Sequence, residues 1–145
     1  MIKVLKFGGT SVGSAANMKK VAEIVRREQA RITVLSAMSG TTDSLVRISR
    51  AAASGDRNAI EEQLAMLTDK YTRCIEELLR ERKQQALARM NATFGLIRDE
   101  AAAFEEYESE RKIIAQGELL TSAIFTAYLQ ETGLKAECLY SPDFM

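Results

Sequence analysis

The chain has 145 residues, of which 46% are hydrophobic, and its twenty basic side chains balance its twenty acidic ones. Because neither sign of charge forms a long run, a nucleic-acid partner is not expected. No stretch approaches the roughly 20 apolar residues of a membrane span, and the N-terminus lacks the apolar segment of a signal peptide. We therefore expect a cytoplasmic protein without a membrane partner. The chain contains no histidine, so any catalysis must use lysine, arginine, carboxylates, hydroxyls or backbone groups.

The two cysteines, Cys74 and Cys138, are far apart in the sequence, and neither belongs to a CxxC motif. Each lies in a segment whose pattern is typical of a helix or a strand. We therefore predict two buried thiols rather than a disulfide or a metal-binding pair, and we predict no metal ligands.

The first half of the chain alternates predicted strands and helices. Residues 2 to 7 are strand-like and end at Gly8-Gly9, and a helix with its apolar face at Met18, Val21, Ala22 and Val25 follows. Residues 32 to 35 form a second apolar run, and residues 36 to 42 form a loop of small residues that opens another helix. This order predicts a parallel sheet covered by helices. A right-handed crossover would place both loops at the carboxyl edge of that sheet.

The middle of the chain has the periodicity of two amphipathic helices. The apolar positions of the first are Ile60, Leu64, Leu67, Tyr71, Cys74 and Leu78, and those of the second are Leu87, Met90, Phe94, Ile97, Ala101 and Phe104. We expect the two stripes to face each other as a helical hairpin, with residues 81 to 83 in the solvated turn. The hairpin would be an insertion at residues 57 to 107, and packing is its expected role.

The last third of the chain predicts one more helix and one more strand. The helix would start near Ser109 and stop at Gly133, and residues 135 to 140 would form a third strand, followed by a loop at residues 141 to 145. No composition shift separates two domains. Three strands are few for an α/β sheet, so we expect a truncated domain.

The strongest candidate site is the segment from Lys6 to Ser11, in which a strand delivers a lysine to its end and two glycines follow. Glycines allow backbone N–H groups to approach an anion closely, and the N-terminus of the next helix favours negative charge at the same place. Lys6 could stabilise charge on a transferring phosphoryl group. The order of lysine and glycines differs from that of a Walker A loop. A purely structural strand-to-helix turn is the alternative interpretation.

Two further segments could complete a site. The loop at residues 36 to 42 carries small hydroxyl side chains that can donate to a carboxylate or phosphate, although serine and threonine are also common N-caps. Glu118 follows Gly117 inside the last predicted helix, where a glycine usually has a packing or ligand-access reason. The Glu118 carboxylate could receive a substrate ammonium group, or it could simply be solvated.

The strings KFGGTS from Lys6, LSAMSGTT from Leu35 and QGELL from Gln116 occur in this order and spacing. With them the chain resembles the aspartate kinases of the amino-acid kinase superfamily over nearly its whole length. The resemblance implies a three-layer α/β/α sandwich with a mainly parallel sheet, of which residues 1 to 145 would be the truncated, N-terminal, aspartate-binding half. Family members often have histidine where Gln116 stands. The family's downstream Gly-Arg-Gly-Gly-Ser-Asp stretch would lie beyond Met145.

The resemblance also implies a reaction, in which ATP with Mg²⁺ phosphorylates the side-chain carboxylate of L-aspartate to 4-phospho-L-aspartate. This reaction is the entry to lysine, threonine and methionine synthesis. By motif match, Lys6 would be catalytic, and Ser36, Thr42 and Glu118 would bind L-aspartate. The residues implied in phosphate binding are Lys6, Phe7, Gly8, Gly9, Thr10 and Ser11. The parent protein would be a homo-oligomer, and this chain alone would be inactive.

Two other functions remain open from the sequence. The chain could be a non-catalytic module that binds an anion and docks a partner through its helical hairpin. It could also belong to an amino-acid kinase with a different acceptor, such as glutamate or acetylglutamate.

Overall fold

The computed structural model describes residues 1 to 140, which form two strands and five helices. In chain order these are β1 (Val4–Phe7), α1 (Ala15–Glu28), β2 (Ile32–Leu35), α2 (Thr41–Ser54), α3 (Arg57–Leu78), α4 (Lys83–Ala102) and α5 (Glu106–Glu131). Among these residues, no helix combines the length and the apolar character that crossing a membrane requires. The predicted loop at residues 141 to 145 lies outside the described part of the chain.

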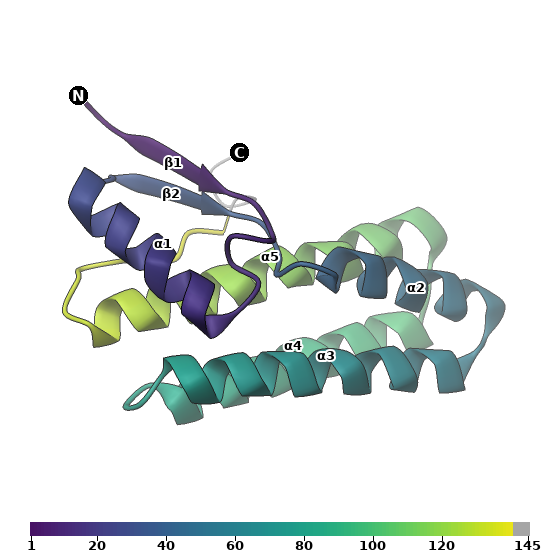
Figure 1. Cartoon of the computed structure of the whole chain (residues 1–145). Helices are drawn as coiled ribbons and strands as arrows, with labels where there is room; N and C mark the ends of the chain where they lie inside the picture. Colours follow the sequence, from purple (N-terminus) through teal and green to yellow (C-terminus); the bar gives the residue numbers. More distant parts are fainter. Residues whose placement is uncertain (141–145) are drawn as a thin grey trace.

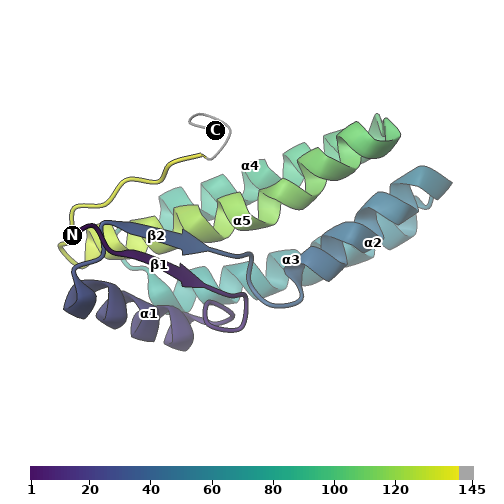
Figure 2. The ribbon, with the colours of Figure 1, turned by 90° about the horizontal axis from the view of Figure 1, so that it is seen from above.

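The two strands form a parallel pair in which Val4 lies opposite Ile32 and Phe7 lies opposite Leu35. Helix α1 makes the crossover between them, so the predicted β-α-β unit is confirmed. Helices α1 and α5 both lie on one side of the sheet, as Figure 1 and the view from above in Figure 2 show. Along each strand, every second side chain faces these helices and the others are exposed. The described residues therefore form two layers, and the third layer of the sandwich stays a prediction.

The third strand predicted at residues 135 to 140 is wrong, because the structure has only two strands in its described part. The segment instead continues from the end of α5, where the Gln130 side-chain amide donates to the carbonyl of Ala136 at 2.7 Å. An extended segment becomes a strand only when a neighbouring strand completes its ladder of hydrogen bonds. The buried position predicted for Cys138 is also wrong, since this residue is exposed, whereas Cys74 is buried as predicted.

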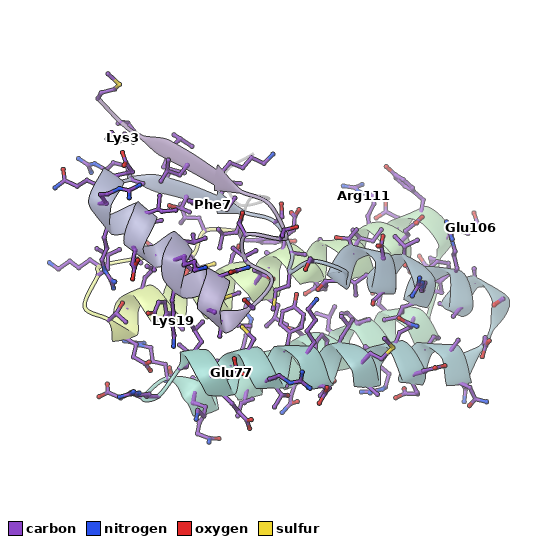
Figure 3. The ribbon with its side chains drawn as sticks, in the orientation of Figure 1. Lys3, Phe7, Lys19, Glu77, Glu106 and Arg111 are labelled. Atoms are coloured by element: carbon purple, nitrogen blue, oxygen red, sulfur yellow. The ribbon has the colours of Figure 1, made fainter. Side chains whose placement is uncertain are left out.

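Helices α2, α3, α4 and α5 form an up-and-down bundle that extends away from the sheet (Figure 1). Helix α2 packs against α3 and α5, and α4 packs against the same two helices. The predicted hairpin of α3 and α4 is confirmed, with Tyr71 and Phe94 in edge-to-face contact at a centroid distance of 5.9 Å. The N-terminal end of α5, marked by Glu106 in Figure 3, lies in the bundle away from the sheet. The C-terminal half of α5 runs beneath the sheet. Helix α5 therefore connects the sheet to the bundle.

Candidate functional site

The loops that follow the two strands meet at the carboxyl edge of the sheet. We call residues 8 to 13 the glycine turn and residues 36 to 42 the hydroxyl loop. The amide of Ser36 donates to the carbonyl of Phe7, and the amide of Ser39 donates to the carbonyl of Gly9, each at 3.1 Å. These bonds continue the parallel pairing of the strands past their ends, so the predicted meeting of the two loops is confirmed.

The glycine turn touches the hydroxyl loop at two glycines, where a side chain would meet close neighbours. A Cβ atom at Gly9 would lie 2.8 Å from the carbonyl oxygen of Ala37, which is a backbone atom and cannot swing away. A Cβ atom at Gly13 would lie 2.8 Å from the side-chain oxygen of Ser39. Real Cβ contacts are longer than this, so close backbone approach is the physical reason for Gly9. At Gly13 the Ser39 hydroxyl could rotate away, and the nearest backbone atom, the Gly9 carbonyl oxygen, would lie 3.1 Å from the Cβ atom.

Helix α5 brings the third motif to the same edge through Gly117. A Cβ atom at this position would lie 3.0 Å from side-chain carbons of both Ala37 and Thr41 and 3.1 Å from the Leu45 side chain. Of the two reasons predicted for a glycine inside this helix, packing and ligand access, packing is confirmed. Glu118 is the next residue, and its side chain is exposed.

Several backbone N–H groups at this edge are free to bind an anion. Within the described residues, the amides of Gly8, Gly9 and Thr10 have no hydrogen-bond acceptor. The amides of Thr42 and Asp43, in the first turn of α2, have none either, and the preceding residue, Gly40, has no side chain that could cap the helix. Helix α1 differs, because it has a side-chain cap. The Ser14 hydroxyl accepts a hydrogen bond from the amide of Asn17, in the first turn of α1, at 3.1 Å. The open amides thus lie in the glycine turn and at the start of α2.

A buried chain of hydroxyl groups holds the hydroxyl loop from below. The Tyr71 hydroxyl, on α3, lies 3.0 Å from the Thr41 hydroxyl and 3.1 Å from the Thr121 hydroxyl on α5. Thr121 in turn accepts a hydrogen bond from the amide of Met38 at 3.2 Å. Tyr71, Thr121 and Thr41 are at most 1% exposed. The Tyr71 phenol is protonated at neutral pH, as an ordinary tyrosine is, and can donate one hydrogen bond; burial raises its pKa further.

Lys70 makes a second connection from α3, because its amino group donates to the carbonyl of Ser39. We did not predict a site role for Lys70, Tyr71 or Thr121 from the sequence. The sequence pattern places Tyr71 in an apolar stripe, where packing alone explains its position. Its phenolic oxygen was the available signal, because a buried hydroxyl requires a hydrogen-bond partner.

The predicted site residues occupy different parts of this edge. Ser36 is half-buried at the start of the hydroxyl loop, and Thr42 is exposed in the first turn of α2. Phe7 packs its ring against the core, on the side of the sheet where the helices lie (Figure 3). Thr10 and Ser11 are exposed in the glycine turn.

Lys6 lies on the other face of the sheet, where the strand alternation leaves its side chain exposed. Within the described residues its side chain makes no ion pair and no hydrogen bond, so none joins it to Thr42 or Glu118. Its neighbour across the pair is Val34. The catalytic role of Lys6 therefore stays a prediction.

A concave surface also exists away from this edge. A groove of about 410 Å³ is lined by residues of α3 and by Arg98 of α4; the α3 residues are Glu61, Leu64, Ala65, Thr68, Asp69 and Thr72. Arg98 and Glu61 form a two-point ion pair across it, with donor–acceptor distances of 2.7 and 3.1 Å. The groove contains none of the predicted site residues, so the loop edge remains the candidate site.

Known proteins resemble the chain in sequence and in fold. It is 32% identical over 142 residues to aspartokinase 1, chloroplastic, of Arabidopsis thaliana, covering 92% of this chain and 24% of that protein. The structure of Escherichia coli aspartokinase III in complex with lysine and aspartate superposes with a TM-score of 0.84 at 25% identity, over 92% of this chain and 30% of that one. The structure of the same enzyme with aspartate and ADP superposes with a TM-score of 0.80 at 25% identity, over 94% and 30%.

The chain thus spans 24% to 30% of the length of these relatives. The model of the amino acid kinase family matches residues 1 to 144, which is nearly the whole chain. The chain therefore belongs to the amino acid kinase family, and its resemblance to aspartokinases is confirmed.

Proposed function

We propose that the chain is the N-terminal, aspartate-binding part of a kinase domain that transfers the γ-phosphoryl group of ATP to the side-chain carboxylate of L-aspartate. The meeting of the glycine turn, the hydroxyl loop and Gly117 at one sheet edge carries this proposal. The relatives support it, because they are aspartokinases and two of their solved structures contain aspartate. The product, 4-phospho-L-aspartate, would enter lysine, threonine and methionine synthesis.

The reaction suits a site without histidine. The attacking group is already an anionic carboxylate, so no general base is needed, and the protein has to position two anions and reduce their repulsion. The open amides of the glycine turn, from Gly8 to Thr10, would bind phosphate oxygens together with Ser11. Lys6 would reach the transferring phosphoryl group from the uncovered face of the sheet.

L-aspartate would lie over the start of α2. Its carboxylates would accept from the hydroxyls of Ser36 and Thr42 and from the open amide of Thr42, where the N-terminus of a helix favours negative charge. Glu118, exposed beside Gly117, would receive the ammonium group. The described residues include no group of three side chains suited to hold a metal ion. We propose that Mg²⁺ arrives with ATP and is coordinated by its phosphate oxygens.

We also propose that this chain needs further protein to act as an enzyme. A chain of this length lacks a large share of the residues present in its relatives. We propose that the third layer, the adenine side of the nucleotide site and the subunit contacts of a homo-oligomer belong to a longer protein. The 145-residue chain alone would then bind L-aspartate weakly and form no aspartyl phosphate.

Trapping aspartyl phosphate with hydroxylamine tests the reaction, in this chain and in a longer protein that continues it into the rest of a kinase domain. L-aspartate, L-glutamate and N-acetyl-L-glutamate are compared as acceptors. Product that forms from L-aspartate, and only in the longer protein, supports both L-aspartate as the substrate and the incompleteness of the 145-residue chain. Turnover by the 145-residue chain would contradict incompleteness, and preference for another acceptor would contradict the substrate.

Lys6→Met tests the catalytic assignment in the longer protein. Loss of a charge that stabilises the transition state should lower kcat by about 10²- to 10³-fold. Lys3→Met is the matched control, since Lys3 lies three residues earlier and bonds to Glu28 at 3.1 Å. Unchanged turnover in Lys6→Met would favour the non-catalytic anion-binding module.

A further inference from the structure

We propose that Lys70 and Tyr71, consecutive residues of the helical hairpin, are positioning residues that hold the hydroxyl loop in its ligand-binding conformation. The inference rests on the proposed function for the identity of the ligand. It assigns to α3 a role in the site, whereas the sequence predicted packing for the hairpin, with docking of a partner as the alternative.

The Tyr71 hydroxyl connects the hydroxyl loop to two helices at once. It has one proton, so it donates to one of its two threonine neighbours and accepts from the other. Both directions are compatible with the bond that Thr121 accepts from the amide of Met38. All three hydroxyls are buried, and a partner lost in such a place leaves a polar group without compensation. Movement of Met38 or Thr41 is therefore opposed by the loss of these bonds.

Lys70 fixes Ser39, the residue after Met38 in the hydroxyl loop. Its amino group donates to the Ser39 carbonyl, and it lies 3.7 Å from the place where a Cβ atom of Gly40 would be. Within the described residues Lys70 has no acidic partner in an ion pair. Its charge is therefore available to the hydroxyl loop.

The hydroxyl loop depends on such tethers because of its own composition. Ala37 and Gly40 have no polar side chain that could bind back to the fold, and Gly40 has a positive φ of 82°. Ser39 is exposed, and among the described residues its backbone N–H bonds only to the Gly9 carbonyl and its own carbonyl only to Lys70. Ordering a ligand loop before the ligand arrives lowers the entropic cost of binding. The two α3 side chains supply this order.

Amide hydrogen exchange on the 145-residue chain tests the tethering directly. We expect Tyr71→Phe and Lys70→Met each to speed exchange of the Met38 and Thr41 amides by about tenfold, while amides of β1 and β2 keep their rates. Lys70→Arg should restore slow exchange, because a guanidinium can also donate to the Ser39 carbonyl. The matched control is Thr72→Val, which removes a hydroxyl from the same helix at a residue bonded to Met90 instead of to the loop.

Titration with L-aspartate, monitored by chemical shifts of the same amides, tests the link to binding. From the net free energy that one or two hydrogen bonds contribute, we expect the Kd for L-aspartate to rise by about 3- to 10-fold in Tyr71→Phe and Lys70→Met. The Kd of Thr72→Val should be unchanged. Unchanged loop exchange in both variants would overturn the inference. Faster exchange with unchanged Kd would overturn it as well, since the loop order would not serve binding.

Failure of the proposed function gives a different result. If the wild-type chain and the longer protein both fail to bind L-aspartate, the substrate assignment is wrong. The exchange rates of the variants then decide by themselves whether Lys70 and Tyr71 hold the loop.

Discussion

Gly117 shows how one missing side chain allows α5 to approach the hydroxyl loop. A methyl group there would be 3.0 Å from Ala37 and Thr41 side-chain carbons, which is closer than carbon atoms normally pack. Gly117→Ala should therefore lower the free energy of unfolding by about 1–3 kcal/mol through overpacking. Urea titration followed by far-UV circular dichroism measures the change.

Gly95→Ala is the matched control for this substitution. Gly95 also lies inside a helix, but a Cβ atom there would meet nothing within 4 Å. Alanine is the better helix former, so the free energy of unfolding should rise by about 0.5–1 kcal/mol. A rise in both variants would contradict the close contact of Gly117 with the hydroxyl loop.

The buried thiol of Cys74 should make the free energy of unfolding depend on pH in the alkaline range. Burial raises the pKa of its thiol from 9.0 to about 11. Between pH 9 and pH 11 the thiol is ionised in the unfolded chain but still protonated in the folded chain. The free energy of unfolding therefore keeps its full value below pH 9 and falls as the pH rises to about 11. The expected decline is about 1.4 kcal/mol per pH unit.

Urea unfolding at several pH values between 8 and 11 measures this decline. Cys74→Ala should remove the part of the slope that begins at pH 9. Cys138→Ala should keep it, because that residue is exposed. Equal slopes in the two variants would show that the Cys74 thiol does not control the decline.

At the scale of elements, a single carboxylate connects the end of α5 to the turn between α3 and α4. The two carboxylate oxygens of Glu131 accept from the amide of Arg80 at 3.0 and 2.9 Å, and one of them accepts from the amide of Arg82 at 2.8 Å. These N–H groups precede α4 and would otherwise need water or another partner. Glu131 thereby fixes one end of the bundle.

Glu131→Ala should lower the free energy of unfolding by about 1–3 kcal/mol, because charge-assisted hydrogen bonds are removed at once. Glu108→Ala is the control, since Glu108 lies at the other end of α5 and its side chain is 64% exposed. We expect that substitution to change stability by less than about 0.5 kcal/mol. Equal unfolding midpoints for the two variants would contradict the role of Glu131.

At the scale of the whole molecule, the sheet is covered on one face only. Val4, Ile32 and Val34 are 58%, 52% and 44% exposed on the open face, whereas Leu35, adjacent to Val34 in the chain, is 8% exposed. An apolar face of this kind marks a place where further protein can pack. This arrangement agrees with a two-layer part of the predicted three-layer sandwich.

Alanine substitutions at Val34 and Leu35 test this asymmetry. In the 145-residue chain, Leu35→Ala should cost about 2–5 kcal/mol and Val34→Ala less than about 1 kcal/mol. In a longer protein whose third layer covers the open face, Val34→Ala should cost about as much as a buried substitution. Equal small costs of Val34→Ala in both proteins would contradict the third layer.

The local pattern of the sequence was enough to predict much of the fold. The two strands, the parallel pairing, the hairpin of α3 and α4 and the end of α5 near Gly133 are all present. These features depend on residues that are close in sequence, on side-chain period and on the handedness of one crossover. The meeting of the two loops follows from that crossover, so the candidate edge was predicted as well.

Only the tertiary structure decided the remaining features. Residues 135 to 140 have a strand-like composition, but a strand needs a neighbour, and that neighbour is not specified by its own residues. Tyr71 has the spacing of a core residue, and its role depends on Thr121, which lies 50 positions later. A periodicity reports which face of an element is buried, whereas a hydrogen bond between distant elements depends on where packing brings two atoms together.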